Sequence, residues 1–188
     1  IREDIKKISI PLVINPNIQS RGLMTLDGIE LIKKKNLIKT TLSTAKFMKD
    51  SISSIYLCYE DGTIISTEAV SAEDELKYRK FLVYTEALNA STKPVWIGVH
   101  ENEFSAEKHR IVFSYVRAIY DTGTFRPTGV IIFNLPVSVL DDICARRDDY
   151  NIAIMDRKGQ VLYISKFFNS KIIDEGMTFH EIAKNPGG

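Results

Sequence analysis

Aromatic and basic side chains gather on two predicted strands of this 188-residue chain. Trp96 is the only tryptophan, and strand alternation puts it on the same face as Gly98. In the next predicted strand, 110–120, Tyr115 and Arg117 share one face. A glycine beside a tryptophan leaves open space, which favours the floor of a binding cavity, although an aromatic residue on a strand also suits a core.

Arg117 needs a partner, because a guanidinium in an apolar strand is costly unless it is paired. That partner is either a carboxylate of the protein or a ligand. Asp121, at the end of the same strand, is the nearest candidate in the sequence, and capping of the following turn is an equal interpretation of it.

Motifs for catalysis, metals and cofactors are absent from the sequence. The histidines His100, His109 and His180 lack HExxH spacing, and there is no GxGxxG, P-loop or GxSxG pattern. Cys58 and Cys144 lie far apart among apolar neighbours, so we expect two buried thiols, with a disulfide as the alternative in an oxidising compartment. We predict no catalytic residue, no metal site and no cofactor. An enzyme would require His100 or His109 to meet a carboxylate and Cys58.

Composition limits the class of protein. Hydrophobic residues make up 44% and charged residues 26%, which is typical of a globular chain. Lys plus Arg is 25 against 24 for Asp plus Glu, which argues against a nucleic-acid partner. No run approaches the roughly 18–20 apolar residues of a membrane span. The chain lacks an initiator Met and stops in a turn-like sequence, so we expect a piece of a longer protein.

Hydrophobic periodicity predicts the elements that must position these side chains. Apolar residues recur at helical spacing in 1–10 and again over about 18–51. Two β-rich runs in 54–67 flank Asp61-Gly62, a pattern typical of a hairpin. The other expected elements are a helix over 71–89 with Ser71 as its N-cap, strands over 95–99, 110–120 and 129–135, and a helix beginning near Pro136.

The segment 151–165 repeats the 54–67 hairpin about 97 residues later, which predicts a duplicated unit. The first copy is expected to be an α+β lobe with an antiparallel sheet, and the concave sheet face beneath the 71–89 helix is the expected place for a pocket. The predicted organisation is a helical stalk 1–52, a lobe 53–136, a connecting helix 137–150 and an incomplete second lobe 151–188.

Four stretches carry a family resemblance. They are the hairpin 55–66 after a long helix, 84–87 leading to 94–96, 113–121, and 129–136. Their order is similar to that of the extracellular double-Cache (dCache) sensor domains of bacterial receptors, and looks closest to Gram-positive sensor histidine kinases of the YesM type. Asn134 stands where that family more often has Asp.

The resemblance implies a membrane-distal PAS-like lobe with a five-stranded antiparallel sheet, followed by part of a membrane-proximal lobe. It implies a ligand between helix and sheet, a homodimer formed through the N-terminal helix, and a membrane-embedded parent with this part on the extracellular side. Some relatives bind amino acids through an Arg-x-Trp-Tyr cluster, of which only Tyr84 is present here, so a carbohydrate or peptide signal is expected instead. Trp96 and Tyr84 are placed to stack on a sugar. The candidate ligand-binding residues are Tyr84, Trp96, Gly98, Tyr115, Arg117 and Asp121.

The leading hypothesis is therefore the extracellular ligand-sensing domain of a two-component sensor histidine kinase, without catalytic activity in this part of the chain. One alternative is a protein-interaction or dimerisation module without a small-molecule pocket. Others are the sensor of a chemoreceptor or diguanylate cyclase, or a cytosolic PAS sensor.

Overall fold

The computed structural model describes residues 2–19, 23, 26–70, 77–106 and 110–139, together with two short strands at 153–155 and 161–164. The helices are α1 (Arg2–Val13), α2 (Pro16–Gln19), α3 (Gly28–Phe47), the 3-10 turn η3 (Tyr78–Lys80) and α4 (Leu82–Asn89). The strands are β1 (Ser54–Tyr59), β2 (Ile64–Ser66), β3 (Val95–Glu101), β4 (Ile111–Tyr120), β5 (Pro127–Pro136), β6 (Ala153–Met155) and β7 (Val161–Ile164).

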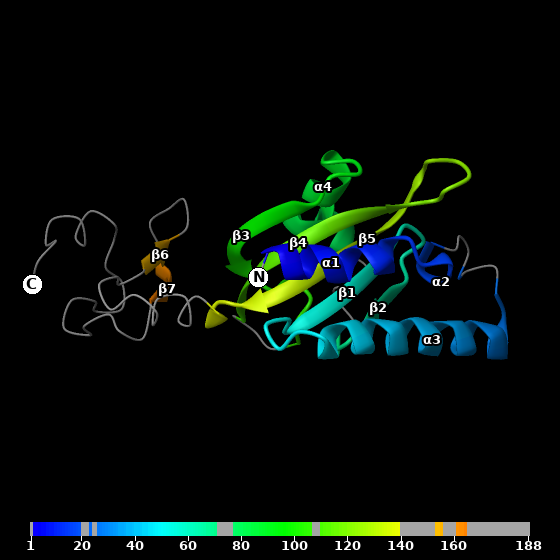
Figure 1. The fold of residues 1–188 in the computed structure, drawn as a ribbon, viewed down its shortest axis with the longest axis horizontal. Helices are drawn as coiled ribbons and strands as arrows, with labels where there is room; N and C mark the ends of the chain where they lie inside the picture. The colour runs from blue at the N-terminus through cyan, green and yellow to red at the C-terminus, as the bar shows by residue number, and fades with distance from the viewer. Residues whose placement is uncertain are drawn as a thin grey trace, which may run out of the picture.

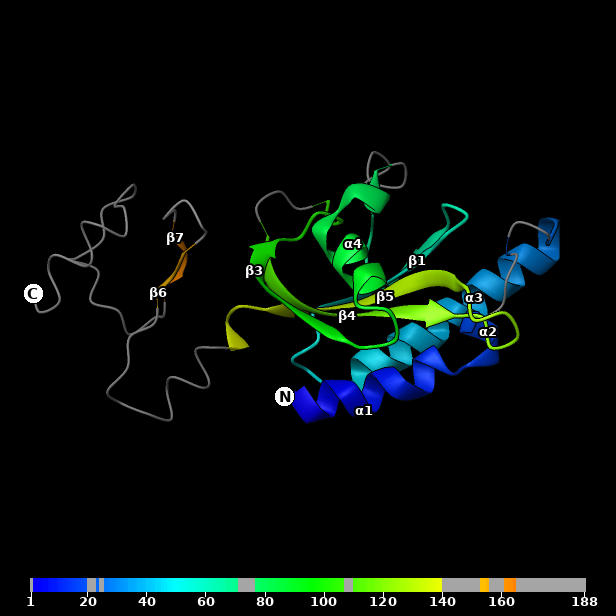
Figure 2. The ribbon, with the colours of Figure 1, turned by 90° about the horizontal axis from the view of Figure 1, so that it is seen from above.

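Strands β1 to β5 form one antiparallel sheet in the order β2-β1-β5-β4-β3. Figure 1 shows the sheet, and Figure 2 shows α1 and α3 on one face of it with α4 on the other. The predicted α+β fold with a five-stranded antiparallel sheet is confirmed. β1 and β2 form the hairpin expected around Asp61-Gly62, and Gly62 takes the positive φ of 99° that this turn needs.

The long N-terminal helix begins later than its periodicity predicts. The apolar repeat starts near residue 18, but α2 ends at Gln19 and α3 begins only at Gly28. Asp27 is extended, and Gly28 has a positive φ of 42°, so the backbone changes direction before α3. The first helix, α1, extends past Pro11 to Val13, with the proline in its last turn.

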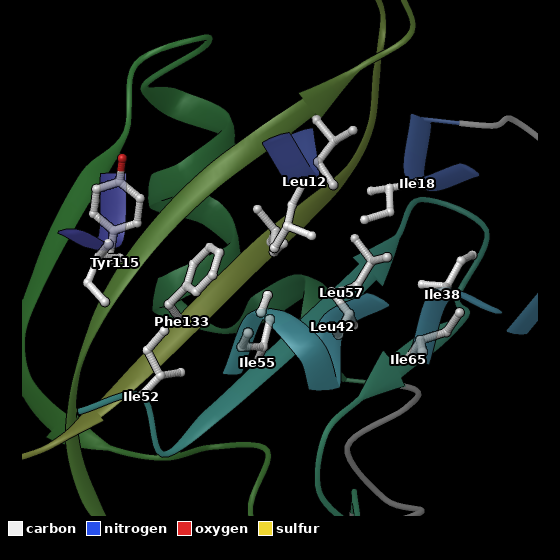
Figure 3. Close-up of a cluster of buried hydrophobic side chains, with 14 of the residues drawn as sticks. Leu12, Ile18, Ile38, Leu42, Ile52, Ile55, Leu57, Ile65, Tyr115 and Phe133 are labelled. Atoms are coloured by element: carbon white, nitrogen blue, oxygen red, sulfur yellow. The ribbon is translucent and has the colours of Figure 1, made fainter. Parts of the chain in front are cut away.

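Two apolar clusters hold the helices against the sheet. Figure 3 shows the first, in which side chains of α1 and α3, such as Leu12 and Leu42, meet Leu57 and Phe133 of the sheet. The second lies under α4 and contains Cys58 and other β1, β4 and β5 side chains. Because both faces are covered, β1 and β5 are buried along almost their whole length and carry near-continuous apolar runs.

Several expectations concern residues outside the described part of the chain. These are the N-cap at Ser71, the connecting helix beyond residue 139 and most of the second lobe. β6 and β7 pair antiparallel at the position of the repeated hairpin.

Gly129 marks the closest approach of β5 to β1. A Cβ at this position would lie 2.5 Å from the Cys58 carbonyl oxygen and 3.1 Å from the Tyr59 Cα, both backbone atoms that cannot move aside locally. We predict that Gly129→Ala lowers the free energy of unfolding by about 1–3 kcal/mol, measured by urea denaturation.

Gly98→Ala is the matched control, because a Cβ there meets no atom within 4 Å. It is expected to leave the free energy of unfolding within about 0.5 kcal/mol of the parent. Equal stability of the two variants would contradict the β1–β5 packing described here.

Candidate functional site

The six predicted ligand-binding residues do not gather in one place. Trp96 and Tyr115 lie together on the face covered by α1, with ring centroids 5.0 Å apart. Tyr84 is buried on the opposite side, between α4 and the sheet, edge-on to Tyr78. The side chains of β3 and β4 therefore alternate between the two faces of the sheet as expected. Trp96 and Tyr84, however, lie on opposite faces of the sheet. The two rings cannot stack on the same sugar.

Gly98 lies at an open position rather than on a cavity floor. It is exposed, and the pairing of β3 with β4 shifts register between Ile97 and His100. The shift interrupts the side-chain alternation just after Gly98. As a result His100 contacts Ser114, whose side chain is on the α4 side of the sheet.

Arg117 and Asp121 have separate partners. Arg117 Nη1 donates a hydrogen bond to Ser9 Oγ of α1, at 3.3 Å. Asp121 Oδ1 accepts bonds from the Thr124 backbone N–H and hydroxyl, each at 2.7 Å. The turn-capping interpretation thus describes Asp121, and the partner of Arg117 is a hydroxyl rather than a carboxylate.

A row of polar side chains, three of them buried and one half-buried, crosses the α4 face of the sheet. Ser54 of β1 lies opposite Asn134 of β5, and Asn134 lies opposite Ser114 of β4. The Ser114 Oγ atom is 2.6 Å from Asn134 Oδ1 and 3.3 Å from Nε2 of His100 on β3. The side chains of Ser54, Ser114 and Asn134 are almost fully buried. We call these four residues the polar row.

Hydrogen bonding in the polar row is incomplete. His100 Nδ1 is 2.7 Å from the Gly98 carbonyl, so the proton of the ring lies there and Nε2 is an acceptor. Burial lowers the pKa of His100, which keeps the ring neutral at pH 7. Ser114 has a single proton for two nearby acceptors, and the buried Ser54 hydroxyl has no well-formed hydrogen bond. A ligand with hydroxyl or amide groups would satisfy this row.

A second polar cluster adjoins the row on the same face. The Tyr56 hydroxyl donates to Glu68, Asn102 Nδ2 donates to the Tyr56 hydroxyl at 3.2 Å, and Arg110 pairs with Glu68 at 2.8 Å. Burial and the Glu68 carboxylate raise the pKa of Tyr56, so the phenol stays protonated. These bonds tie the segment after β2 to the segment between β3 and β4.

Aromatic rings fill the space between α4 and the sheet in this structure. Phe104, from the segment after β3, stacks on Tyr56 with ring centroids 4.8 Å apart and meets Phe81 edge-on at 4.9 Å. Tyr78 packs against Tyr84 in the same way at 5.0 Å. The polar row therefore lies beside a closed aromatic cluster.

Sequence reasoning missed the polar row. The sequence predicts no binding role for Ser114, and Asn134 stands out in it only as a departure from a family pattern. The sequence feature that could have indicated the row is a polar residue, Ser114 or Asn134, within each of two otherwise apolar strand runs. Their meeting depends on the register between β4 and β5, which a single strand pattern does not specify.

Nucleophilic and metal chemistry find little support in this part of the chain. Cys58 is a free, buried thiol, and burial raises its pKa, so it stays protonated and is a poor nucleophile. Among the described residues, no group of three or more His, Cys, Asp and Glu side chains is placed to hold a metal ion. Cys144 lies outside those residues.

Comparisons with known proteins identify the architecture. No family model matches the chain, and no curated protein matches it. Among solved structures, it resembles the ligand-binding domain of the Campylobacter jejuni chemoreceptor Tlp3 in complex with 4-methylisoleucine. The TM-score is 0.64 at 18% identity, over 95% of this chain and 66% of that one. The chain thus spans about two-thirds of the length of that domain.

Two Pseudomonas domains match as well. The ligand-binding domain of the P. fluorescens chemoreceptor CtaA with L-valine has a TM-score of 0.56 at 15% identity, over 97% of this chain and 75% of that one. The domain of the P. aeruginosa amino acid chemoreceptor PctC with GABA has a TM-score of 0.54 at 17% identity, over 86% and 69%. The fold is the PAS-like Cache fold, here a five-stranded sheet with N-terminal helices. Within the described ranges, no helix is both long enough and apolar enough to cross a bilayer.

The half-buried ring of His100 makes the stability of the protein depend on pH. Its pKa is lowered in the folded protein and is about 6.5 when unfolded, so the unfolded chain binds the proton more readily. The contribution of the neutral His100 ring to the free energy of unfolding is complete above about pH 6.5. It is lost as the pH falls through the pKa that His100 has in the folded protein. We predict that His100→Gln reduces the fall in unfolding free energy between pH 7 and pH 5, measured by urea denaturation at each pH. A parallel pH profile in parent and variant would show that His100 is not held neutral.

Proposed function

We propose that the chain is the ligand-sensing lobe of an extracellular bacterial receptor, and that its ligand binds between α4 and the sheet, against the polar row. The observation that carries this proposal is the polar row itself. Buried hydroxyl and amide groups cost free energy unless they are hydrogen-bonded, and an apolar sheet face would pack α4 without that cost. A row left with unused hydrogen-bonding capacity is therefore better explained by binding than by folding.

The chemistry of the row favours a neutral ligand. Ser54, Ser114, Asn134 and neutral His100 carry no formal charge. The adjoining Glu68 and Arg110 neutralise each other. The matched chemoreceptor domains hold 4-methylisoleucine, L-valine and GABA, all of which carry an ammonium group that a carboxylate would stabilise. The Asn134 amide of the row suits the hydroxyl groups of a sugar or the amide groups of a peptide better than the ammonium group of an amino acid. This supports a carbohydrate or peptide signal.

Binding requires the aromatic cluster to open. Phe104 occupies the space beside the row, and the segment that carries it is held by the contacts of Asn102 and Arg110. A ligand would displace Phe104 and loosen these contacts. Because the ligand binds the open arrangement and not the closed one, its binding shifts the population between them, which is the requirement for signalling.

The proposed parent is a membrane-embedded sensor histidine kinase of a two-component system, with this lobe on the extracellular side and no catalytic role for the lobe. The order of sequence elements supports this assignment. The matched domains come from chemoreceptors, so a chemoreceptor is the alternative parent, and a diguanylate cyclase is another.

A second candidate function, dimerisation, is favoured by the outer face of α3. Ile29, Ile32 and Phe47 are 71%, 59% and 91% exposed on that side. Between them lies a shallow groove of about 490 Å³, lined by Asn36, Lys39, Thr40, Ser43, Thr44 and Phe47. We propose that the lobe forms a homodimer through this face of α3. The dimer is compatible with ligand sensing and does not depend on it.

The ligand proposal is tested by a thermal-shift screen of neutral sugars, short peptides and amino acids. We expect a sugar or peptide to raise the melting temperature. Ser114→Ala removes one hydrogen bond of the row and is expected to weaken binding of that compound about tenfold, measured by calorimetry. Thr40→Ala, which removes a hydroxyl from the α3 groove instead, is the matched control and should leave the affinity unchanged.

An absence of any stabilising compound class would contradict small-molecule sensing by this lobe. If only amino acids raised the melting temperature, the proposal of a neutral ligand would be contradicted. If Ser114→Ala left that rise unchanged, the position of the ligand against the polar row would be contradicted as well.

The dimer proposal is tested by sedimentation equilibrium. Phe47→Ala is expected to weaken dimerisation by about thirty-fold, because an exposed aromatic anchor is lost. Lys39 lines the groove, so each protomer would bring a positive charge to the proposed interface, and the dimer should strengthen as salt screens these like charges. Phe125→Ala removes another exposed aromatic, 80% exposed in the β4–β5 turn, and serves as the control. A monomer at every concentration and salt, or an equal effect of Phe125→Ala, would contradict the proposal.

A further inference from the structure

The contact between α1 and the sheet contains one buried polar cluster within an otherwise apolar surface. Ile5 and Leu12 of α1 pack into the apolar core on this face. Between them, Ser9 is fully buried over Tyr115 and Arg117 of β4. We call Ser9, Tyr115 and Arg117 the Ser9 cluster. A buried serine in the middle of an apolar helix face calls for a physical reason.

Every hydrogen-bonding position of the Ser9 hydroxyl is used. It donates to the Lys6 carbonyl at 2.9 Å. Because a serine has a single proton, the contact of 3.4 Å with the Tyr115 hydroxyl must be donated by Tyr115. Arg117 Nη1 donates to the same oxygen at 3.3 Å. Ser9 is therefore the acceptor for two groups of β4, one of them charged.

Neither group has another acceptor among the described residues. The Tyr115 hydroxyl makes only the bond to Ser9. The Arg117 guanidinium makes only its bond to Ser9, and its Nε atom is buried without a partner. Removing the Ser9 oxygen leaves a buried phenol and a half-buried cation without an acceptor, and each is costly.

The apolar pattern of α1 does not by itself specify one position of the helix along the sheet, although Ile18 of the following α2 is buried in the same core and limits how far α1 can shift. If α1 slides by one helical turn, Ile5 or Leu12 takes the position of Ser9, and apolar side chains still face the sheet. In either shifted position the hydrogen bonds are lost, because neither isoleucine nor leucine offers an acceptor to Tyr115 and Arg117.

We infer that the Ser9 cluster fixes the register of α1 on the sheet. The contact favours the one position of the helix in which Ser9 meets Tyr115 and Arg117, and fixing a register is the role for which buried polar contacts are best attested. α1 runs along β4 toward the β4–β5 turn, so its register sets how far its N-terminal end extends (Figures 1 and 2).

The position of the cluster connects it to the other face of the sheet. Tyr115 follows Ser114 in β4, and Ser114 belongs to the polar row on the α4 side. A displacement of β4 at Ser114 therefore moves the acceptor contact that holds α1. This connection rests on the proposed ligand-sensing function, whereas the register itself is a property of the ligand-free protein and is tested there.

The test is a distance measurement between spin labels on the exposed positions Lys7 of α1 and Thr122 of the β4–β5 turn. In the otherwise unchanged protein, we expect one narrow distance distribution. In Ser9→Ala, we expect a second component displaced by about 5 Å, one helical turn. Leu12→Ala is the control: it removes apolar burial from the same contact, so it should lower the free energy of unfolding and keep the single distribution.

A single unchanged distribution in Ser9→Ala overturns the inference, and so does the same second component in Leu12→Ala. If Ser9→Ala does not unfold cooperatively, Tyr115→Phe replaces it, because it removes one donor and keeps the ring packing. The second component is then expected at a lower population, and an unchanged distribution overturns the inference.

Discussion

Consecutive residues of β4 face opposite layers of the molecule, and the arrangement of the lobe depends on this alternation. Ser114 faces α4 and hydrogen-bonds to Asn134 of β5. Tyr115 faces α1 and hydrogen-bonds to Ser9. Both side chains are almost fully buried. β4 is thus the element where two buried polar groups lie back to back, one toward each helical layer.

The serine hydroxyls of the two polar groups differ in their hydrogen bonding. The Ser9 oxygen has its full set of hydrogen bonds, although the Arg117 Nε atom of the same cluster has none. On the other face, Ser114 has one proton for two acceptors and Ser54 has no good partner. Incomplete bonding in a buried site favours a role in binding. The two groups lie on opposite faces of one sheet that is packed on both sides.

The sequence indicated most of the architecture because its patterns are local. The Asp61-Gly62 turn, the strand runs and the α+β class follow from turn chemistry and periodicity. The faces of Trp96 and Tyr115 follow from alternation. The start of α3 was misplaced because the apolar repeat continues through the non-helical residues near Asp27. Periodicity identifies a helical face but does not locate its first residue.

The candidate site was harder to predict, for a physical reason. Alternation says which residues share a face, but it does not say which helix covers that face. Trp96 and Arg117 lie under α1, whereas Tyr84 lies under α4. The residues of the polar row come from β1, β3, β4 and β5 and meet because of the register between these strands. The register shift between Ile97 and His100 places His100 next to Ser114. These relations are set by tertiary structure.

The central claim is that a small molecule binds against the polar row and that β4 passes the change to α1. Amide chemical shifts of the ¹⁵N-labelled protein test it most directly, during titration with the compound that stabilises it most. The account predicts the largest changes at His100, Ser114 and Asn134, with smaller changes reaching Ser9. Changes confined to the α3 groove between Asn36 and Phe47 would contradict it, because they would make the lobe an interaction module alone.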